Sequence, residues 1–136
     1  MDKTGILSHI ELYVFDLTRS AKFWGWLLEE LGYRQYQAWD NGISYKRGDT
    51  YIVFVQVDGK YRDIPHHRTG IGLNHIAFSV ESCEQLDHIM RELKARNVPL
   101  LYAEKDVIAE ANDKDMIYFE DPDSTKVELV CTHQKE

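Results

Sequence analysis

Two short stretches decide the fold of this chain, HIELYV at residues 9–14 and HIAFSV at residues 75–80. Both read His-Ile, any residue, an apolar residue, any residue and Val, and they lie 75 − 9 = 66 residues apart. In the first stretch apolar residues alternate with others, which is typical of a β-strand with one face in a core. A repeat of this kind predicts two similar halves, with the two histidines on equivalent strands related by a pseudo-twofold axis.

An amphipathic helix is predicted after each stretch. The first helix, capped by Asp16 or Thr18, carries apolar residues at every fourth position and ends at Gly32. The second begins at Ser82, where a glutamine three residues later forms a capping box, and it ends near Asn97. The two halves therefore repeat the order strand, helix, strands.

Short strands complete each half. We expect them at residues 43–47 and 51–57, and then at 100–103, 106–110, 116–120 and 126–131. The chain has 136 residues, which fits a single domain, 1–136. Within it we predict a first module at about 6–58, a polar linker loop at 58–72, and a second module at about 73–132.

Composition narrows the class of protein. There are 16 Lys and Arg against 23 Asp and Glu, a formal net charge of −7, which argues against nucleic acid or an anionic membrane as a partner. No apolar run is long enough to span a membrane, and the first residues do not resemble a signal peptide. Cys83 and Cys131 are far apart in the sequence, so we expect reduced thiols in a cytoplasmic protein.

Three residues form a candidate metal site. His9 and His75 occupy equivalent strands and can converge on the pseudo-twofold axis, while Glu128 faces away from its neighbours Val127 and Leu129 on the last strand. Two histidines and a carboxylate can bind a divalent metal and leave positions open for a substrate. Each residue alone has a simpler reading: His75 as a hydrogen-bonded core histidine, Glu128 as a solvated strand residue, and His9 as a surface residue.

At this point the chain resembles the vicinal oxygen chelate superfamily, which includes glyoxalase I, methylmalonyl-CoA epimerase, fosfomycin-resistance enzymes, extradiol dioxygenases and bleomycin-binding proteins. The resemblance covers nearly the whole chain. It rests on HIELYVFDL at 9–17 with Ser20 and Phe23-Trp24, LGY at 31–33, NHIAFSV at 74–80, FEDPDS at 119–124 and KVEL at 126–129.

The resemblance implies an α+β fold of two tandem βαβββ modules whose curved mixed sheets surround a central cleft with a divalent metal. The ligands would be His9, His75, Glu128 and one residue in 52–56. In this superfamily the metal chelates vicinal oxygens of a small substrate and stabilises an enolate or oxyanion, and Glu128 would then act as a base. The metal could be Zn, Ni, Mn, Fe or Co. Members of this length often form homodimers.

The fourth ligand and the substrate pocket follow less directly. Aligning Asp49 with Asp123 pairs Phe54, which cannot bind a metal, with Glu128. Gln56, two residues on, becomes the candidate if the first hairpin is longer or bulged. Without Gln56, two histidines and one carboxylate remain, the set that resembles dioxygenases and fosfomycin enzymes. The side chains expected to line a substrate pocket are Glu11, Tyr13, Tyr45 and Tyr118.

Three functions remain open at the level of sequence. The first is a divalent-metal-dependent enzyme acting on a small oxygenated substrate, as a lyase, isomerase or dioxygenase. The second is a metal-free antibiotic-binding protein of the bleomycin-resistance type, to which the charge of −7 lends support. The third is a diverged domain without catalysis. A pure binding protein has no physical need for His9, His75 and Glu128, so their presence favours the enzyme.

Overall fold

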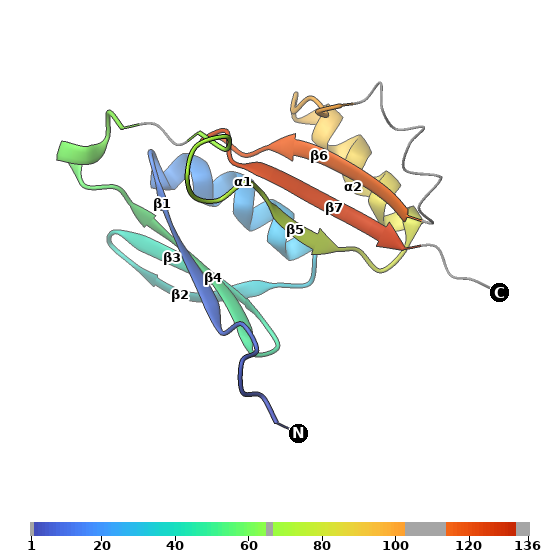
Figure 1. Cartoon of the computed structure of the whole chain (residues 1–136), viewed down its shortest axis with the longest axis horizontal. Coiled ribbons are helices and arrows are strands. Elements are labelled where there is room, and N and C mark those ends of the chain that lie inside the picture. The colour runs from blue at the N-terminus through green and yellow to red at the C-terminus, as the bar shows by residue number, and fades with distance from the viewer. Residues whose placement is uncertain (1, 65–66, 103–113, 133–136) are drawn as a thin grey trace. The chain divides into compact units, whose positions relative to one another are not determined.

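The computed structural model describes residues 2–64, 67–102 and 114–132, and the chain forms two compact units, Met1–Pro65 and His66–Glu136 (Figure 1). Each unit contains one helix and one small mixed sheet, with four strands in the first unit and three described strands in the second. The prediction of an α+β fold built from two similar modules is confirmed. Among the described residues, no helix is long and apolar enough to cross a membrane.

The first unit contains β1 (His9–Val14), α1 (Leu17–Glu30), β2 (Arg34–Trp39), β3 (Gly42–Arg47) and β4 (Thr50–Gln56), followed by a 3-10 turn at Gly59–Tyr61. The strand order in its sheet is β1-β4-β3-β2. The pair β1–β4 is parallel, and the other pairs are antiparallel. Asp16 caps α1, because its side chain accepts a hydrogen bond from the Arg19 N–H at 3.2 Å.

The core of the first unit lies between α1 and one face of this sheet. The Trp24 ring stacks on Phe54 of β4 with 5.2 Å between ring centroids. Leu27 and Leu28 on the same helix are completely buried, and so are Trp24 and Phe54. Because side chains alternate along a strand, the opposite face of the sheet carries His9, and α1 does not cover it.

The second unit contains β5 (Ile76–Ser79), α2 (Cys83–Ala95), β6 (Lys114–Glu120) and β7 (Lys126–Thr132). The strand order is β5-β7-β6, with β5 parallel and β6 antiparallel to β7. Ser82 caps α2 as predicted, since its side chain accepts from the Gln85 N–H at 3.1 Å. The Gln85 side chain accepts from the N–H of Glu81, one residue before the cap, at 2.8 Å. The buried faces of α2 and β7 pack together.

Two predicted strands of the second half have different outcomes. The strand predicted at 100–103 is described up to residue 102, and of these residues Leu101 alone pairs, through an isolated bridge to Tyr118. The strand predicted at 106–110 lies outside the described residues.

The strand β2 (Arg34–Trp39) was not predicted from the sequence. All six of its residues are exposed, so it has no buried apolar side to produce an alternating pattern. The strand lies at the edge of the sheet, where β3 pairs with it through a bulged register between Gln35 and Ala38.

The prediction of reduced thiols is wrong. Cys83 and Cys131 form a disulfide, with 5.5 Å between their Cα atoms. The two cysteines are 48 residues apart, so the sequence pattern did not predict their pairing. They come together because the first residue of α2 packs against the end of β7. The bond therefore fastens the helix of the second unit to the strand that carries Glu128.

Candidate metal centre

The second unit brings together two of the three predicted ligands. His75 Nε2 lies 3.0 Å from Glu128 Oε1, and the two side chains are 33% and 13% exposed. His75 immediately precedes β5, and Glu128 lies on the neighbouring parallel strand β7, opposite Ala77. The pair is therefore partly screened from water but still reachable from one side.

The orientation of the His75 ring is fixed by its neighbour. His75 Nδ1 lies 2.7 Å from Asn74 Oδ1, and an amide oxygen can only accept, so Nδ1 carries the proton and donates it. In the neutral ring this leaves a lone pair on Nε2, the atom that faces the carboxylate. A second hydrogen bond of this kind commonly orients histidines that bind metals.

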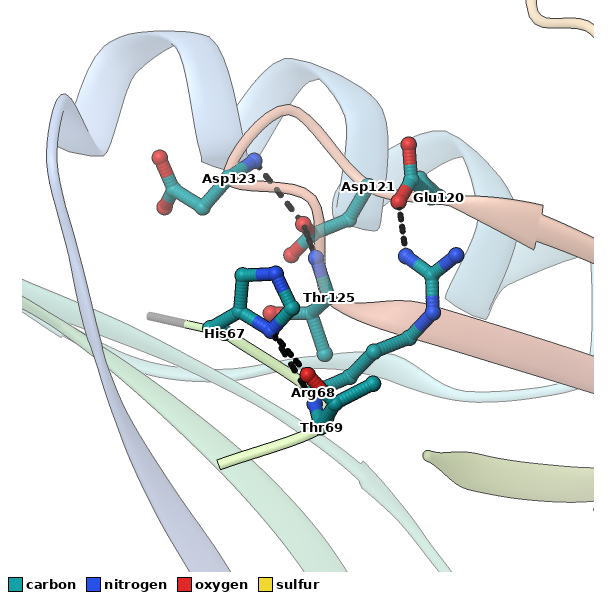
Figure 2. Close-up of polar contacts among 7 residues, drawn as sticks. All are labelled: His67, Arg68, Thr69, Glu120, Asp121, Asp123 and Thr125. Carbon is teal, nitrogen blue, oxygen red and sulfur yellow. Dashed lines mark hydrogen bonds and ion pairs between the residues drawn. The ribbon is translucent and has the colours of Figure 1, made fainter. Parts of the chain in front are cut away.

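The position of Glu128 follows from the alternation of β7. Val127 and Leu129 are completely buried on the side that packs against α2, so Glu128 points to the opposite face. The loop before β7 is held by Asp121, whose carboxylate accepts the N–H groups of Asp123 and Thr125, both at 2.8 Å (Figure 2). This loop sets the register of β7 and hence the place of Glu128.

Within the second unit, the predicted pocket residue Tyr118 lies beside this pair. It is directly opposite Glu128 in the β6–β7 ladder, and its ring packs edge-on against His75 with 6.1 Å between centroids. Burial raises the pKa of Tyr118, and the nearby charge of Glu128 raises it further. The Tyr118 hydroxyl donates to Met116 Sδ at 3.2 Å.

In the first unit, His9 lies on the sheet face that α1 leaves uncovered. Its ring stacks on Tyr51 with 4.5 Å between centroids and an interplanar angle of 9°. Its Nδ1 lies 3.1 Å from the hydroxyl of Ser8. Glu11 and Tyr13 alternate with core positions on the same strand and are exposed on this face. These three predicted residues thus share one side of β1.

The strand register identifies Val53 as the first-unit equivalent of Glu128. Glu11 lies opposite Val53, as Ala77, its counterpart in the repeat, lies opposite Glu128. Val53 is buried and has no atom that can bind a metal. The sequence alignment that matched Phe54 with Glu128 was shifted by one residue, because the two hairpin loops differ in length.

Gln56 lies on the opposite face from His9, opposite Val14 in the ladder. Its Oε1 accepts from the Leu17 N–H at 2.8 Å, and its Nε2 donates to the Phe15 carbonyl at 2.8 Å. A longer or bulged first hairpin, the condition on which Gln56 could be a ligand, is not observed, since Arg47 and Thr50 pair directly around a two-residue turn. The Gln56 amide thus secures the start of α1, and we leave it out of the ligand set.

Tyr45 also lies on the face that α1 covers. It is 4% exposed, and its ring packs against Phe54 with 6.2 Å between centroids. Burial raises the pKa of its phenol. Tyr45 is therefore part of the core of the first unit. The strand register puts it on the opposite face of the sheet from Glu11 and Tyr13, so the expectation that it lines a pocket with them is wrong.

Metal-binding groups are sparse on each unit. Among residues 2–64, 67–102 and 114–132, no group of three or more His, Cys, Asp or Glu side chains could hold a metal ion. The pair His75–Glu128 supplies two ligand atoms, so the second unit alone offers part of a coordination sphere.

Two residues near Glu128 were missed by the sequence analysis. Lys126 lies two residues before Glu128 on β7, so the period of the strand could have placed it on the same face. Tyr102 follows the isolated bridge at Leu101, and its ring lies 5.5 Å from that of Tyr118. No sequence signal indicates that contact.

Comparisons with known proteins show which family this chain resembles. Residues 6–129 match the family model of the glyoxalase/bleomycin resistance protein/dioxygenase superfamily. The uncharacterized protein YqjT of Bacillus subtilis is 44% identical over 125 residues, which cover 92% of this chain and 98% of YqjT.

Solved structures extend the likeness to the fold. A candidate glyoxalase from Bacillus halodurans has a TM-score of 0.90 and 43% identity, and the match covers 95% of this chain and 97% of that one. The fosfomycin resistance protein FosX of Listeria monocytogenes, solved with Mn(II) and sulfate, has a TM-score of 0.66 and 22% identity, with coverage of 93% and 92%.

Proposed function

We propose, from the premise that this chain belongs to the glyoxalase/bleomycin resistance protein/dioxygenase superfamily, that it is a divalent-metal-dependent enzyme acting on a small oxygenated substrate. The reaction would be that of a lyase, an isomerase or a dioxygenase. The single observation that carries the proposal is the pairing of His75 Nε2 with Glu128 Oε1 at 3.0 Å.

The donor set fits a divalent ion. A neutral imidazole nitrogen and a carboxylate oxygen are both electron-pair donors, and a cation between them relieves their mutual repulsion. Asn74 holds the ring so that Nε2 faces the carboxylate. We assign the third ligand to His9, because it occupies the equivalent position of the repeated strand in the first unit.

Each residue then has a defined role. A divalent ion at such a site would stabilise negative charge that develops on substrate oxygens. Glu128 is the proton acceptor that we assign to proton-transfer chemistry, and the Tyr118 ring lies opposite it in the β6–β7 ladder. Glu11 and Tyr13 are the first-unit side chains that we propose for substrate contact.

The ion and the assembly are also part of the proposal. Mn(II) is the first ion to test, because the FosX relative contains it, followed by Fe, Co, Ni and Zn. The substrate is a small molecule, the protein is cytoplasmic, and the chain works as a homodimer.

The test is elemental analysis of the purified protein after removal of metal and reloading with each ion in turn. We expect about one ion per chain in the wild type and a loss of most of it in His75→Ala and Glu128→Gln, with the fold retained by circular dichroism. The matched control is His88→Ala, a histidine at an exposed position of α2. This variant should keep its metal.

A wild type that takes up none of the five ions would contradict the enzyme proposal. The metal-free alternative, an antibiotic-binding protein, would then lead, since the net charge of −7 suits a cationic ligand. That alternative has its own test, because a basic antibiotic of the bleomycin class should raise the melting temperature without any metal. If the panel gives no shift, the binding protein is rejected as well.

A further inference from the structure

A second group of side chains surrounds the phenol of Tyr102, on the face of the second sheet that carries Glu128. Lys126 lies on β7 two residues before Glu128, and Glu120 lies opposite Lys126 on β6. The Lys126 Nζ lies 4.7 Å from the ring centroids of both Tyr102 and Tyr118. The ammonium is thus held between two aromatic rings, a placement that favours the cation.

Two cations lie beside the Tyr102 phenol and lower its pKa. One is Lys126, and the other is Arg68 from the turn before β5. Arg68 also forms an ion pair with Glu120 (Figure 2). The hydrogen bond from Lys126 is the largest influence that lowers the pKa of Tyr102, and the charge of Lys126 and the contact with Arg68 lower it further.

The backbone holds Tyr102 in an unusual conformation. Its φ is +57°, in the left-handed region that a residue with a side chain rarely adopts. The Leu101 N–H, one residue earlier, donates to the Tyr118 carbonyl at 2.7 Å and fixes this segment to β6. Such strain persists where the surroundings enforce it, and it often marks functional positions. The side chain is 41% exposed, so an incoming molecule can reach it.

Tyr118 connects Tyr102 to the His75–Glu128 pair. Its ring lies 5.5 Å from that of Tyr102 and 6.1 Å from that of His75. We propose that Tyr102 acts as a phenolate and is a second proton acceptor of the site besides Glu128, with Lys126 and Arg68 as its counter-ions.

The proton transfer rests on the proposed function, because it needs an acidic C–H or O–H of the small oxygenated substrate. The phenolate oxygen forms the new O–H bond, and the electron pair of the broken bond stays on the substrate as an enolate or alkoxide. Lys126 and Arg68 keep their protons throughout and only donate hydrogen bonds. Neutral Tyr102 then returns the proton to the product.

The first measurement is a spectrophotometric titration of tyrosine at 295 nm, on the full chain without added metal. We expect one of the 8 tyrosines to ionise at a pH below the ordinary tyrosine range, which gives the absorbance titration a separate low-pH component. Tyr102→Phe should remove that component, and Lys126→Met or Arg68→Met should move it to higher pH. The control is Tyr36→Phe, another exposed tyrosine with a lysine, Lys46, 4.5 Å from its ring centroid. That variant should retain the component.

The second measurement is nitration by tetranitromethane, which prefers ionised tyrosines, followed by peptide mass mapping. Tyr102 should be nitrated before Tyr36 at a pH below the ordinary tyrosine range. The inference is overturned if the wild type lacks the low component, if Tyr102→Phe retains it, or if Tyr102 is not nitrated first. Neither measurement needs a metal, so a protein that binds no ion but has an acidic Tyr102 would contradict the proposed function alone.

Discussion

Gly25 and Tyr45 show how a single residue determines what the first sheet presents to α1. A Cβ atom at position 25 would lie 2.9 Å from the Tyr45 hydroxyl oxygen, closer than van der Waals contact allows. Tyr45 is 4% exposed and has little space to move away. The absence of a side chain at Gly25 therefore lets this phenol occupy the core beneath the helix.

Gly25→Ala should consequently fail to produce the gain of about 1 kcal/mol that alanine brings to a helix interior. In the Tyr45→Phe background the crowding oxygen is gone, so the same substitution should raise the free energy of unfolding by up to about 1 kcal/mol. Urea denaturation of the four proteins of this cycle measures the coupling. Additive effects would mean that Tyr45 does not lie against Gly25.

At the same scale, the sequence predicted His75 and Glu128 correctly as neighbours but misjudged the first-unit counterpart of Glu128. The alternation of β7 determines which way Glu128 points, and alternation is visible in a sequence. The counterpart, Val53, depends on the lengths of two hairpin loops, and a shift of one residue reverses the face of every side chain on the strand. Gln56 was assigned to the wrong side for this reason. Tyr45 was also assigned to the wrong side, without reference to that alignment.

At the scale of secondary structure, Gln56 links the end of β4 to the start of α1. Its amide accepts from the Leu17 N–H, one of the helix donors without an intrahelical partner, and donates to the Phe15 carbonyl. Gln56→Ala should lower the free energy of unfolding by roughly 1–2 kcal/mol, because the part-buried Leu17 N–H and the exposed Phe15 carbonyl lose their partner.

The same variant should bind as much metal as the wild type. Gln35→Ala, at an exposed position of the edge strand β2, is the matched control and should change stability by less than about 0.5 kcal/mol. Urea denaturation and elemental analysis are made on the same samples. A variant that loses metal while keeping its stability would return Gln56 to the ligand set.

The disulfide is the covalent link between α2 and β7. Cys83 and Cys131 are 48 residues apart, so on the chain-entropy account the bond should contribute about 4 kcal/mol by restricting the unfolded chain. Urea denaturation with and without reductant should reveal this difference in the wild type. In the double variant Cys83→Ser/Cys131→Ser, reductant should have no effect. Two thiols free for alkylation in the protein as purified would contradict the pairing.

The elements missed by the sequence analysis have a common cause. The exposed edge strand β2 and the disulfide both depend on long-range packing, whereas the elements found by pattern, such as α1 and α2, bury an apolar stripe of their own. Local periodicity reports a buried face. It carries no information about an edge strand with all six residues exposed or a contact across 48 residues.

At the scale of the whole molecule, the repeat makes a prediction that neither unit makes alone. Each unit presents a histidine at the equivalent position of the repeat, His9 in one and His75 in the other, and in the second unit the Glu128 carboxylate lies 3.0 Å from that histidine. If both histidines bind the same ion, removing either one should weaken binding of that ion by a similar, large factor. If the two histidines belong to separate sites, removing one should leave metal binding at the other unchanged.

A double-variant cycle distinguishes these cases. We expect His9→Ala and His75→Ala each to lower metal affinity by at least about tenfold, which is about 1.4 kcal/mol of binding free energy. If both histidines bind one ion, their contributions to the binding free energy are coupled. The double variant should then lose less binding free energy than the sum of the two single losses. Isothermal titration with Mn(II) gives the affinities, and His88→Ala serves as the reference variant. If the losses add, or if His9→Ala binds like the wild type, His9 is not a ligand of the ion held by His75 and Glu128.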